Sequence, residues 1–133
     1  MSYQEALEAA GATVHQFKEF GSYQGDWFAL VTAKGETGWI QGSYGSCSGC
    51  DAFEGEFNYE RGECDQHAYA PRTECLGCQE AKRKLDARLA DFGKTYLDCI
   101  QTTDAVLKIL QENVEWDDGA KEAIDWVRGI SLT

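Results

Sequence analysis

Two Cys-x-x-Cys pairs constrain this chain more than any other feature of its sequence. The first pair is Cys47 with Cys50, and the second is Cys75 with Cys78. Structural Zn²⁺ sites are tetrahedral and closed by four thiolate or imidazole ligands, and two pairs at this separation suit a Cys₄ site. The sequence therefore predicts one structural zinc ion, bound by these four cysteines.

Two further candidate ligands lie between the pairs, in Cys64-Asp65-Gln66-His67. Cys64 and His67 can replace one of the Cys-x-x-Cys pairs around the metal, because a cysteine and a histidine are both zinc ligands. The polar neighbours of His67 favour a solvated loop residue instead. Cys99 lies between Leu97 and Ile100, and we expect it to be a buried small apolar residue.

The length and composition are those of one globular domain spanning residues 1–133. A chain of 133 residues with 43% hydrophobic residues can bury a core without disulfides. No apolar run approaches the roughly 20 residues that cross a bilayer. The first residues lack the basic start and apolar core of a signal peptide. We therefore expect a cytoplasmic protein without a membrane partner, whose thiols stay reduced.

The first half of the chain has the pattern of a small antiparallel meander. Ser2-Tyr3-Gln4-Glu5 is a capping box that predicts a short helix, ending at Gly11. Aromatic and β-branched residues then predict strands at 14–17, 27–33 and 38–41, with a turn at 34–38.

The second half is predicted to contain an irregular hairpin followed by helices. Residues 51–74 are predicted to form the hairpin, and a helix with one apolar face follows Cys75 and is expected to end at Gly93. Two more helices are expected, one capped by a threonine at 102–103 and one beginning with an aspartate at 117–118. The predicted fold class is α+β: a β-meander, a zinc-stapled hairpin module and C-terminal helices.

The order of these elements around the cysteines resembles the treble-clef zinc finger. In that family a strand-side knuckle and a hairpin are followed by a helix whose first turn carries the last two ligands. The resemblance covers about residues 44–92, and Cys47, Cys50, Cys75 and Cys78 match the ligand positions. Asp51 departs from the glycine that such knuckles commonly have. The resemblance implies structural zinc and no particular activity.

The net charge of −11 limits the classes of partner. Twelve basic residues stand against 23 acidic ones, so the field of the protein repels nucleic-acid phosphates. Residues 47–78 carry seven acidic side chains against Arg61 and Arg72. We therefore expect no direct nucleic-acid binding, and instead a protein partner with a basic surface.

Residues 20–59 supply candidate contacts for such a partner. Tyr23 and Tyr44 adjoin glycine-rich turns, where exposed aromatic rings make good protein-binding anchors. Asp51, Glu54 and Glu56 are the acidic residues expected to face the partner. Phe28 and Trp39 lie within predicted strands, and we expect them in the core.

Three segments are similar to small uncharacterised proteins of phages and bacteria: Tyr23 to Trp27, Gly42 to Phe53, and Phe92 to Leu97. The resemblance spans roughly residues 22–97. It implies a phage-type accessory protein and no particular activity. Together with the acidic charge, it leads us to expect an inhibitor or modulator of a host factor that handles nucleic acid.

Two enzymatic alternatives remain open beside this non-catalytic interpretation. Cys-x-x-Cys is also the motif of thiol–disulfide redox proteins, in which it lies between a strand and a helix. In this sequence no helical pattern directly follows Cys50. A zinc-dependent hydrolase or deaminase would need an open zinc position and a nearby acid or base. The motifs of such enzymes are absent from the sequence.

Overall fold

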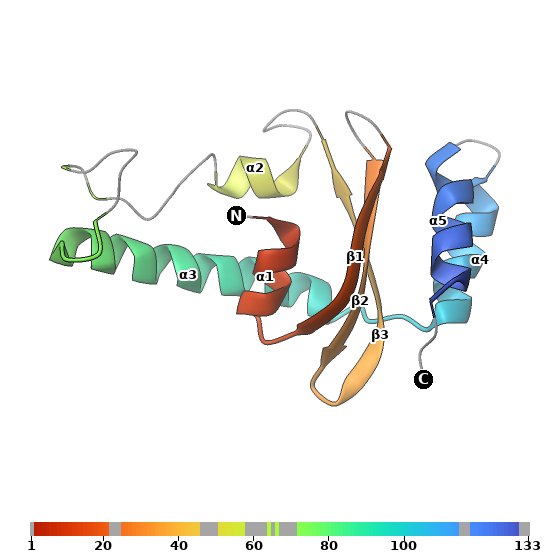
Figure 1. The fold of residues 1–133 in the computed structure, drawn as a ribbon, viewed down its shortest axis with the longest axis horizontal. Helices are drawn as coiled ribbons and strands as arrows, with labels where there is room; N and C mark the ends of the chain where they lie inside the picture. The colour runs from red at the N-terminus through yellow and green to blue at the C-terminus, as the bar shows by residue number, and fades with distance from the viewer. Residues whose placement is uncertain are drawn as a thin grey trace.

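A central antiparallel sheet carries helices on both of its faces (Figure 1). The computed structural model describes residues 2–21, 25–45, 51–57, 64, 66, 72–114 and 118–130. Within these ranges no helix is both long and apolar enough to cross a membrane. The predicted α+β class, with a meander followed by C-terminal helices, is confirmed.

The sheet has the strand order β1 (Thr13–Gly21), β2 (Gly25–Ala33) and β3 (Glu36–Tyr44). A two-residue turn joins β2 to β3. Both of its residues are left-handed, with φ of 53° at Lys34 and 80° at Gly35, which is the backbone that matches the twist of a tight hairpin. The predicted meander is confirmed, and its strands are longer than their apolar centres indicated.

Helices α1 (Tyr3–Ala9), α2 (Ala52–Phe57) and α3 (Leu76–Leu97) cover one face of the sheet (Figure 1). The capping box is present, since Ser2 Oγ accepts a hydrogen bond from Glu5 N–H at 3.2 Å. The core on this face is rich in aromatic rings. Its largest buried members are Tyr3, Leu7, Trp27, Ile40, Phe53, Phe57, Leu85 and Leu89.

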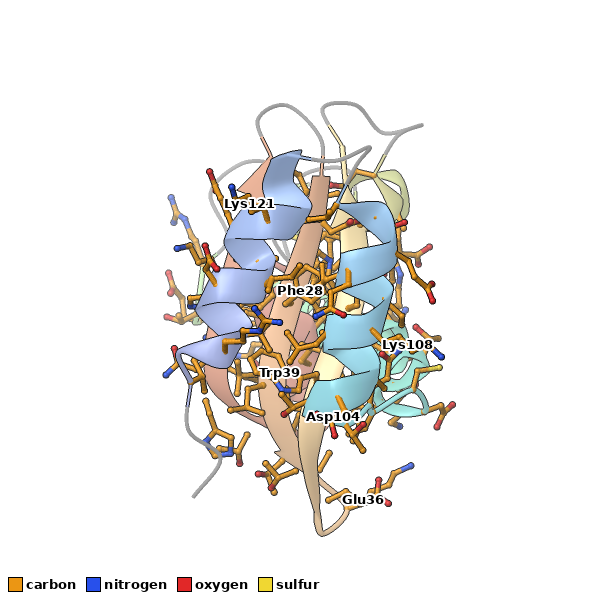
Figure 2. All side chains as sticks on the ribbon, turned by 90° about the vertical axis from the view of Figure 1, so that its right-hand side faces the viewer. Phe28, Glu36, Trp39, Asp104, Lys108 and Lys121 are labelled. Atoms are coloured by element: carbon orange, nitrogen blue, oxygen red, sulfur yellow. The ribbon has the colours of Figure 1, made fainter. Side chains whose placement is uncertain are left out.

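Helices α4 (Thr103–Asn113) and α5 (Asp118–Arg128) cover the other face. Thr102 Oγ1 accepts a hydrogen bond from Ala105 N–H at 3.1 Å and caps α4, as predicted. Figure 2 shows Phe28 and Trp39 lying between the sheet and these two helices. This second core also buries Phe20, Leu30, Val106, Leu110, Ala123, Ile124 and Val127.

Trp39 connects β3 to the chain that enters α4. Its backbone N–H and C=O both bond to Gln101 at 2.8 Å, so that the edge of β3 is partly covered. Its indole N–H donates to Thr103 Oγ1 at 3.0 Å, and its ring packs against Trp126. The core positions predicted for Phe28 and Trp39 are confirmed.

Gly93 does not end α3, which continues to Leu97, so this prediction was wrong. A Cβ atom at position 93 would lie 2.0 Å from the backbone oxygen of Ala6. Gly93 therefore permits α1 to pack directly on the backbone of α3. The helix continues because this tertiary packing outweighs the low helix propensity of glycine.

Two other local predictions were also wrong. Residues 52–57 form helix α2, where an irregular hairpin was expected, because Asp51 caps this short segment. Cys99 is exposed and not buried. It lies in the connection after α3, where the chain turns toward β3.

Candidate metal centre

Three cysteine sulfurs, those of Cys64, Cys75 and Cys78, lie within 4.8 Å of one another. The Sγ of Cys64 is 3.8 Å from that of Cys75 and 3.6 Å from that of Cys78. Sulfurs bound about 2.3 Å from a tetrahedral zinc ion are about 3.8 Å apart. Sulfurs in a disulfide are only about 2.05 Å apart. The three thiols therefore have the spacing of three corners of a tetrahedral metal site.

The start of α3 positions two of these thiols. Cys75 is the N-cap residue, and Cys78 lies in the first turn, so the x-x spacing places both side chains at the same end of the helix. A tight turn precedes them, in which Cys75 N–H donates to the backbone oxygen of Arg72 at 3.2 Å. The partial positive charge of a helix N-terminus favours the thiolate form that metals bind.

Gly77 provides the space that Cys64 occupies. A Cβ atom at position 77 would lie 3.2 Å from Cys64 Cβ and 3.5 Å from Cys64 Sγ. Glycine within a Cys-x-x-Cys turn often serves to allow a sharp bend of the backbone, and Gly77 does not. Its backbone is helical, and it is absent from the described residues with positive φ. The absence of a side chain at Gly77 therefore allows Cys64 to lie close to the helix. Gly77 is not needed for an unusual backbone conformation.

The cysteine centre lies at the end of α3 that extends away from the sheet, opposite to α4 and α5 (Figure 1). Cys78 is buried, and Cys64 and Cys75 are half-buried. Leu76, next to them, is 79% exposed. The centre is thus near the surface, and thiolate sulfur is a soft ligand that suits zinc and related ions.

Two of the four predicted cysteine ligands are brought together by the structure, together with the alternative ligand Cys64. Cys75 and Cys78 adjoin as their spacing predicted. Cys47, Cys50 and His67 lie outside the described residues, so their roles as ligands stay predictions. In the sequence, only the position of Cys64 between the two pairs marked it as a candidate ligand. That position did not show whether Cys64 or the first pair binds the metal together with Cys75 and Cys78.

Asp51 was predicted to face a partner, and the structure corrects this, because the residue is only 6% exposed. Its Oδ1 accepts hydrogen bonds from the Tyr3 hydroxyl at 2.5 Å and from Phe53 N–H at 2.9 Å. Its Oδ2 accepts one from Gly45 N–H at 2.9 Å. Asp51 thus connects α1, the end of β3 and the start of α2 from the interior.

The phenol of Tyr3 is held in its neutral form by this arrangement. Burial raises the pKa of Tyr3 far above its ordinary value of 10.0, and the hydrogen bond to Asp51 raises it further. Burial also raises the pKa of Tyr96, and the negative charge of Asp51 adds to that effect. The sequence contained one signal for this network: an aspartate directly before a segment that can start a helix is a typical N-cap.

The other predicted partner contacts have different environments. Tyr44 is half-buried, and its hydroxyl donates to the backbone oxygen of Phe20 at 3.0 Å. Burial raises its pKa, and the charge of Glu19 adds to this. Glu56 is exposed, and its Oε1 lies 3.2 Å from Nη2 of Arg88, with which it forms an ion pair. The others, Tyr23 and the side chain of Glu54, lie outside the described part of the chain.

No family model, no curated protein and no solved structure matches this chain. The resemblance of residues 22–97 to phage and bacterial proteins therefore stays a prediction. The resemblance of residues 44–92 to a treble clef stays one as well, and α2 occupies part of the segment in which that fold has its hairpin.

Proposed function

We propose that this protein is a zinc-stapled interaction module, in which Cys64, Cys75 and Cys78 bind a structural zinc ion and the acidic surface binds another protein. The observation that carries the metal part is the spacing of the three sulfurs, 3.6 and 3.8 Å for the pairs that include Cys64. Zinc supplies no redox chemistry here. It joins the chain at Cys64 to the start of α3.

A structural role suits the place of the centre in the fold. Between Cys75 and Lys84 the only buried side chain of α3 is that of Cys78. Apolar packing therefore contributes little to the order of this helix end. A bound zinc ion contributes on the order of 10 kcal/mol in small zinc-dependent domains, which is ample to hold a local segment.

Metal analysis of the untagged protein tests this proposal. We expect about one zinc per chain after purification without added metal. The Cys75→Ser variant should lose the ion, because it lacks one of the thiolates. Cys99→Ser is the matched control, since it removes an exposed thiol away from the centre and should retain the metal. Well under one equivalent of metal in folded wild-type protein would refute the zinc site.

The acidic charge supports a partner with a basic surface. The net charge of −11 repels phosphate backbones and steers cationic proteins toward the chain. Accessible acidic groups include Glu56 in α2 and Glu74 directly before Cys75. Leu76, directly after Cys75, adds an exposed apolar side chain to this surface. A basic nucleic-acid-binding surface on a host factor has the complementary charge.

Capture from cell extract at low and high salt tests the binding part. Binding through the acidic surface should weaken as salt rises and in Glu56→Gln, Glu74→Gln and Leu76→Ala variants. Lys108→Gln is a control on α4, which should leave capture unchanged or strengthen it. Binding that is indifferent to both salt and the three substitutions would contradict this mechanism.

One observation favours a second candidate, a thiol–disulfide redox protein. The first Cys-x-x-Cys pair follows β3 and precedes α2, so that a strand and a helix flank it after all. The sheet is antiparallel, however, and α2 has only six residues. Catalysis of insulin reduction that is abolished by Cys47→Ser would replace the zinc-module proposal with this one.

A further inference from the structure

Asp51 anchors both ends of the loop that carries the first Cys-x-x-Cys pair. Gly45 precedes this loop, and its N–H donates to Asp51 Oδ2 at 2.9 Å, so the loop begins and ends at nearly the same point. The Tyr3 hydroxyl donates to Asp51 Oδ1 at 2.5 Å. The position of Asp51 in the molecule is therefore fixed by α1.

This anchor lies beside the C-terminal half of α3. The ring of Tyr3 is 6.0 Å from that of Phe92 and 6.1 Å from that of Tyr96, measured between centroids. Both of those residues belong to the last two turns of α3. Asp51, bonded to the Tyr3 hydroxyl, is close to the same level of the helix.

Helix α2 then runs from this anchor toward the N-terminus of α3. Near its start, the ring of Phe53 packs on Phe92 with centroids 5.5 Å apart. At its end, the ring of Phe57 lies 5.4 Å from the guanidinium carbon of Arg88. Asp51 precedes α2 and is therefore at the end of α2 that is farther from the cysteine centre (Figure 1).

The loop is too short to bridge that separation. At about 1.5 Å of rise per residue, Cys75 and Phe92 are about 25 Å apart along α3. A closed loop of five residues extends at most about 11 Å from its anchored ends, since each residue spans about 3.5 Å. Sulfurs that share one zinc ion must lie within about 4 Å of each other.

We infer that the metal centre at the start of α3 is built without Cys47 and Cys50, and that Cys64 is its third thiolate. This ligand set replaces the single site of two Cys-x-x-Cys pairs that the sequence predicted. The inference rests on the proposed function, because it specifies the ligands of the proposed zinc ion. The fourth position is filled by a group other than these two thiols.

Zinc binding by two variants tests the ligand set. The double variant Cys47→Ser/Cys50→Ser should bind one zinc per chain with wild-type affinity. Cys64→Ser should bind zinc at least about 100-fold more weakly, because loss of an outer-shell partner alone costs 10- to 100-fold. Far-UV circular dichroism shows whether each variant is folded. With Co²⁺ as the probe, the thiolate charge-transfer band per metal should be unchanged in the double variant and reduced in Cys64→Ser.

The wild-type protein offers a second readout that needs no substitution. Zinc-bound thiols resist alkylation, so peptide mapping after treatment with N-ethylmaleimide should find Cys47, Cys50 and Cys99 modified and the three centre cysteines protected. Loss of zinc from the double variant, or protection of Cys47 and Cys50, would overturn the ligand set while leaving zinc binding itself in place. Absence of zinc from the wild-type protein would overturn the proposed function and the ligand set together.

Discussion

The two halves of α3 differ in how many of their side chains are buried. From Leu85 to Leu97 the helix buries one residue in nearly every turn, against α1 and the aromatic core. From Cys75 to Lys84 it buries only Cys78, and Leu76 faces solvent. The apolar core therefore ends about midway along this helix. The proposed zinc site lies at the start of α3, outside this core.

The magnitudes are consistent with such a division. Complete burial of a leucine side chain contributes about 1.5–3 kcal/mol, so several are needed to order a helix. Coordination by three or four thiolates can supply more than this at one point. The sandwich of sheet and helices should therefore fold with or without the metal, whereas the start of α3 should depend on it.

The largest expected effect comes from breaking the packed region. Trp39→Ala removes a fully buried ring together with its contacts to Trp126 and Thr103. We expect the free energy of unfolding to fall by about 3–5 kcal/mol, measured by urea denaturation. Zinc affinity of the folded fraction should stay at the wild-type value, because Trp39 belongs to the other face of the sheet. A loss below about 1 kcal/mol would contradict the packing described.

A matched pair of substitutions in α3 compares its two halves directly. Gly93→Ala places a Cβ atom 2.0 Å from the Ala6 oxygen, so α1 must move, and we expect a loss of about 1–3 kcal/mol. Gly77→Ala meets Cys64 instead, with its Cβ atom 3.2 Å from that of Cys64. It should weaken zinc binding and leave the urea midpoint of the sandwich unchanged. The comparison fails if both variants lower the midpoint equally.

Tyr3→Phe removes one donor to the buried carboxylate of Asp51. A hydrogen bond to a charged group contributes about 1.5–3 kcal/mol, and we expect a loss near the lower end because two backbone donors remain. The folded-state pKa of Tyr3 is raised above its ordinary value of 10.0. The contribution of Tyr3 to the free energy of unfolding is therefore fully present below pH 10, and it declines as the pH rises above 10.

Urea denaturation of both proteins between pH 8 and 12 measures this dependence. The advantage of wild-type Tyr3 over phenylalanine should be constant up to about pH 10 and then shrink. Tyr96 also has a raised pKa, so both proteins should lose stability at high pH and only their difference reports on Tyr3. A difference that grows above pH 10 would show that the phenol is ionised in the folded protein.

The smallest effect is expected on the surface. Glu56→Gln breaks an exposed ion pair with Arg88, and such pairs contribute about 0–1 kcal/mol. We expect a change in the free energy of unfolding within about 0.5 kcal/mol. Any effect of this variant on capture of a partner would then reflect binding and not folding. A larger loss would show that the pair is part of the contact between α2 and α3.

The elements that the sequence predicted are those specified by local patterns. The alternation of the meander, the cap at Thr102 and the helix after Cys75 all depend on residues that are neighbours in the chain. The stop expected at Gly93 was wrong because the reason for this glycine is Ala6, which is remote in sequence. Only a contact between two helices distinguishes a packing glycine from a terminating one.

The candidate site was predictable only in part, for the same reason. The spacing within Cys75-x-x-Cys78 is local and correctly indicated two thiols at the start of a helix. The choice of Cys64 depends on its contact with the start of α3, 11 positions further along the chain, and the spacing of the cysteines alone left several ligand sets open. The burial of Asp51 depends on Tyr3, which is 48 positions away in the sequence, and no composition argument reveals it.

Hydrogen exchange of α3 with and without metal tests the division of this helix most directly. Amides from Gln79 to Lys84, which bond within the helix, should be protected in the zinc-loaded protein and exchange rapidly after the metal is removed with a chelator. Amides from Leu85 to Leu97 should keep their protection in both states, because apolar packing holds them. Metal content measured on the same samples confirms removal. Unchanged protection of residues 79–84 after complete loss of metal would contradict the account.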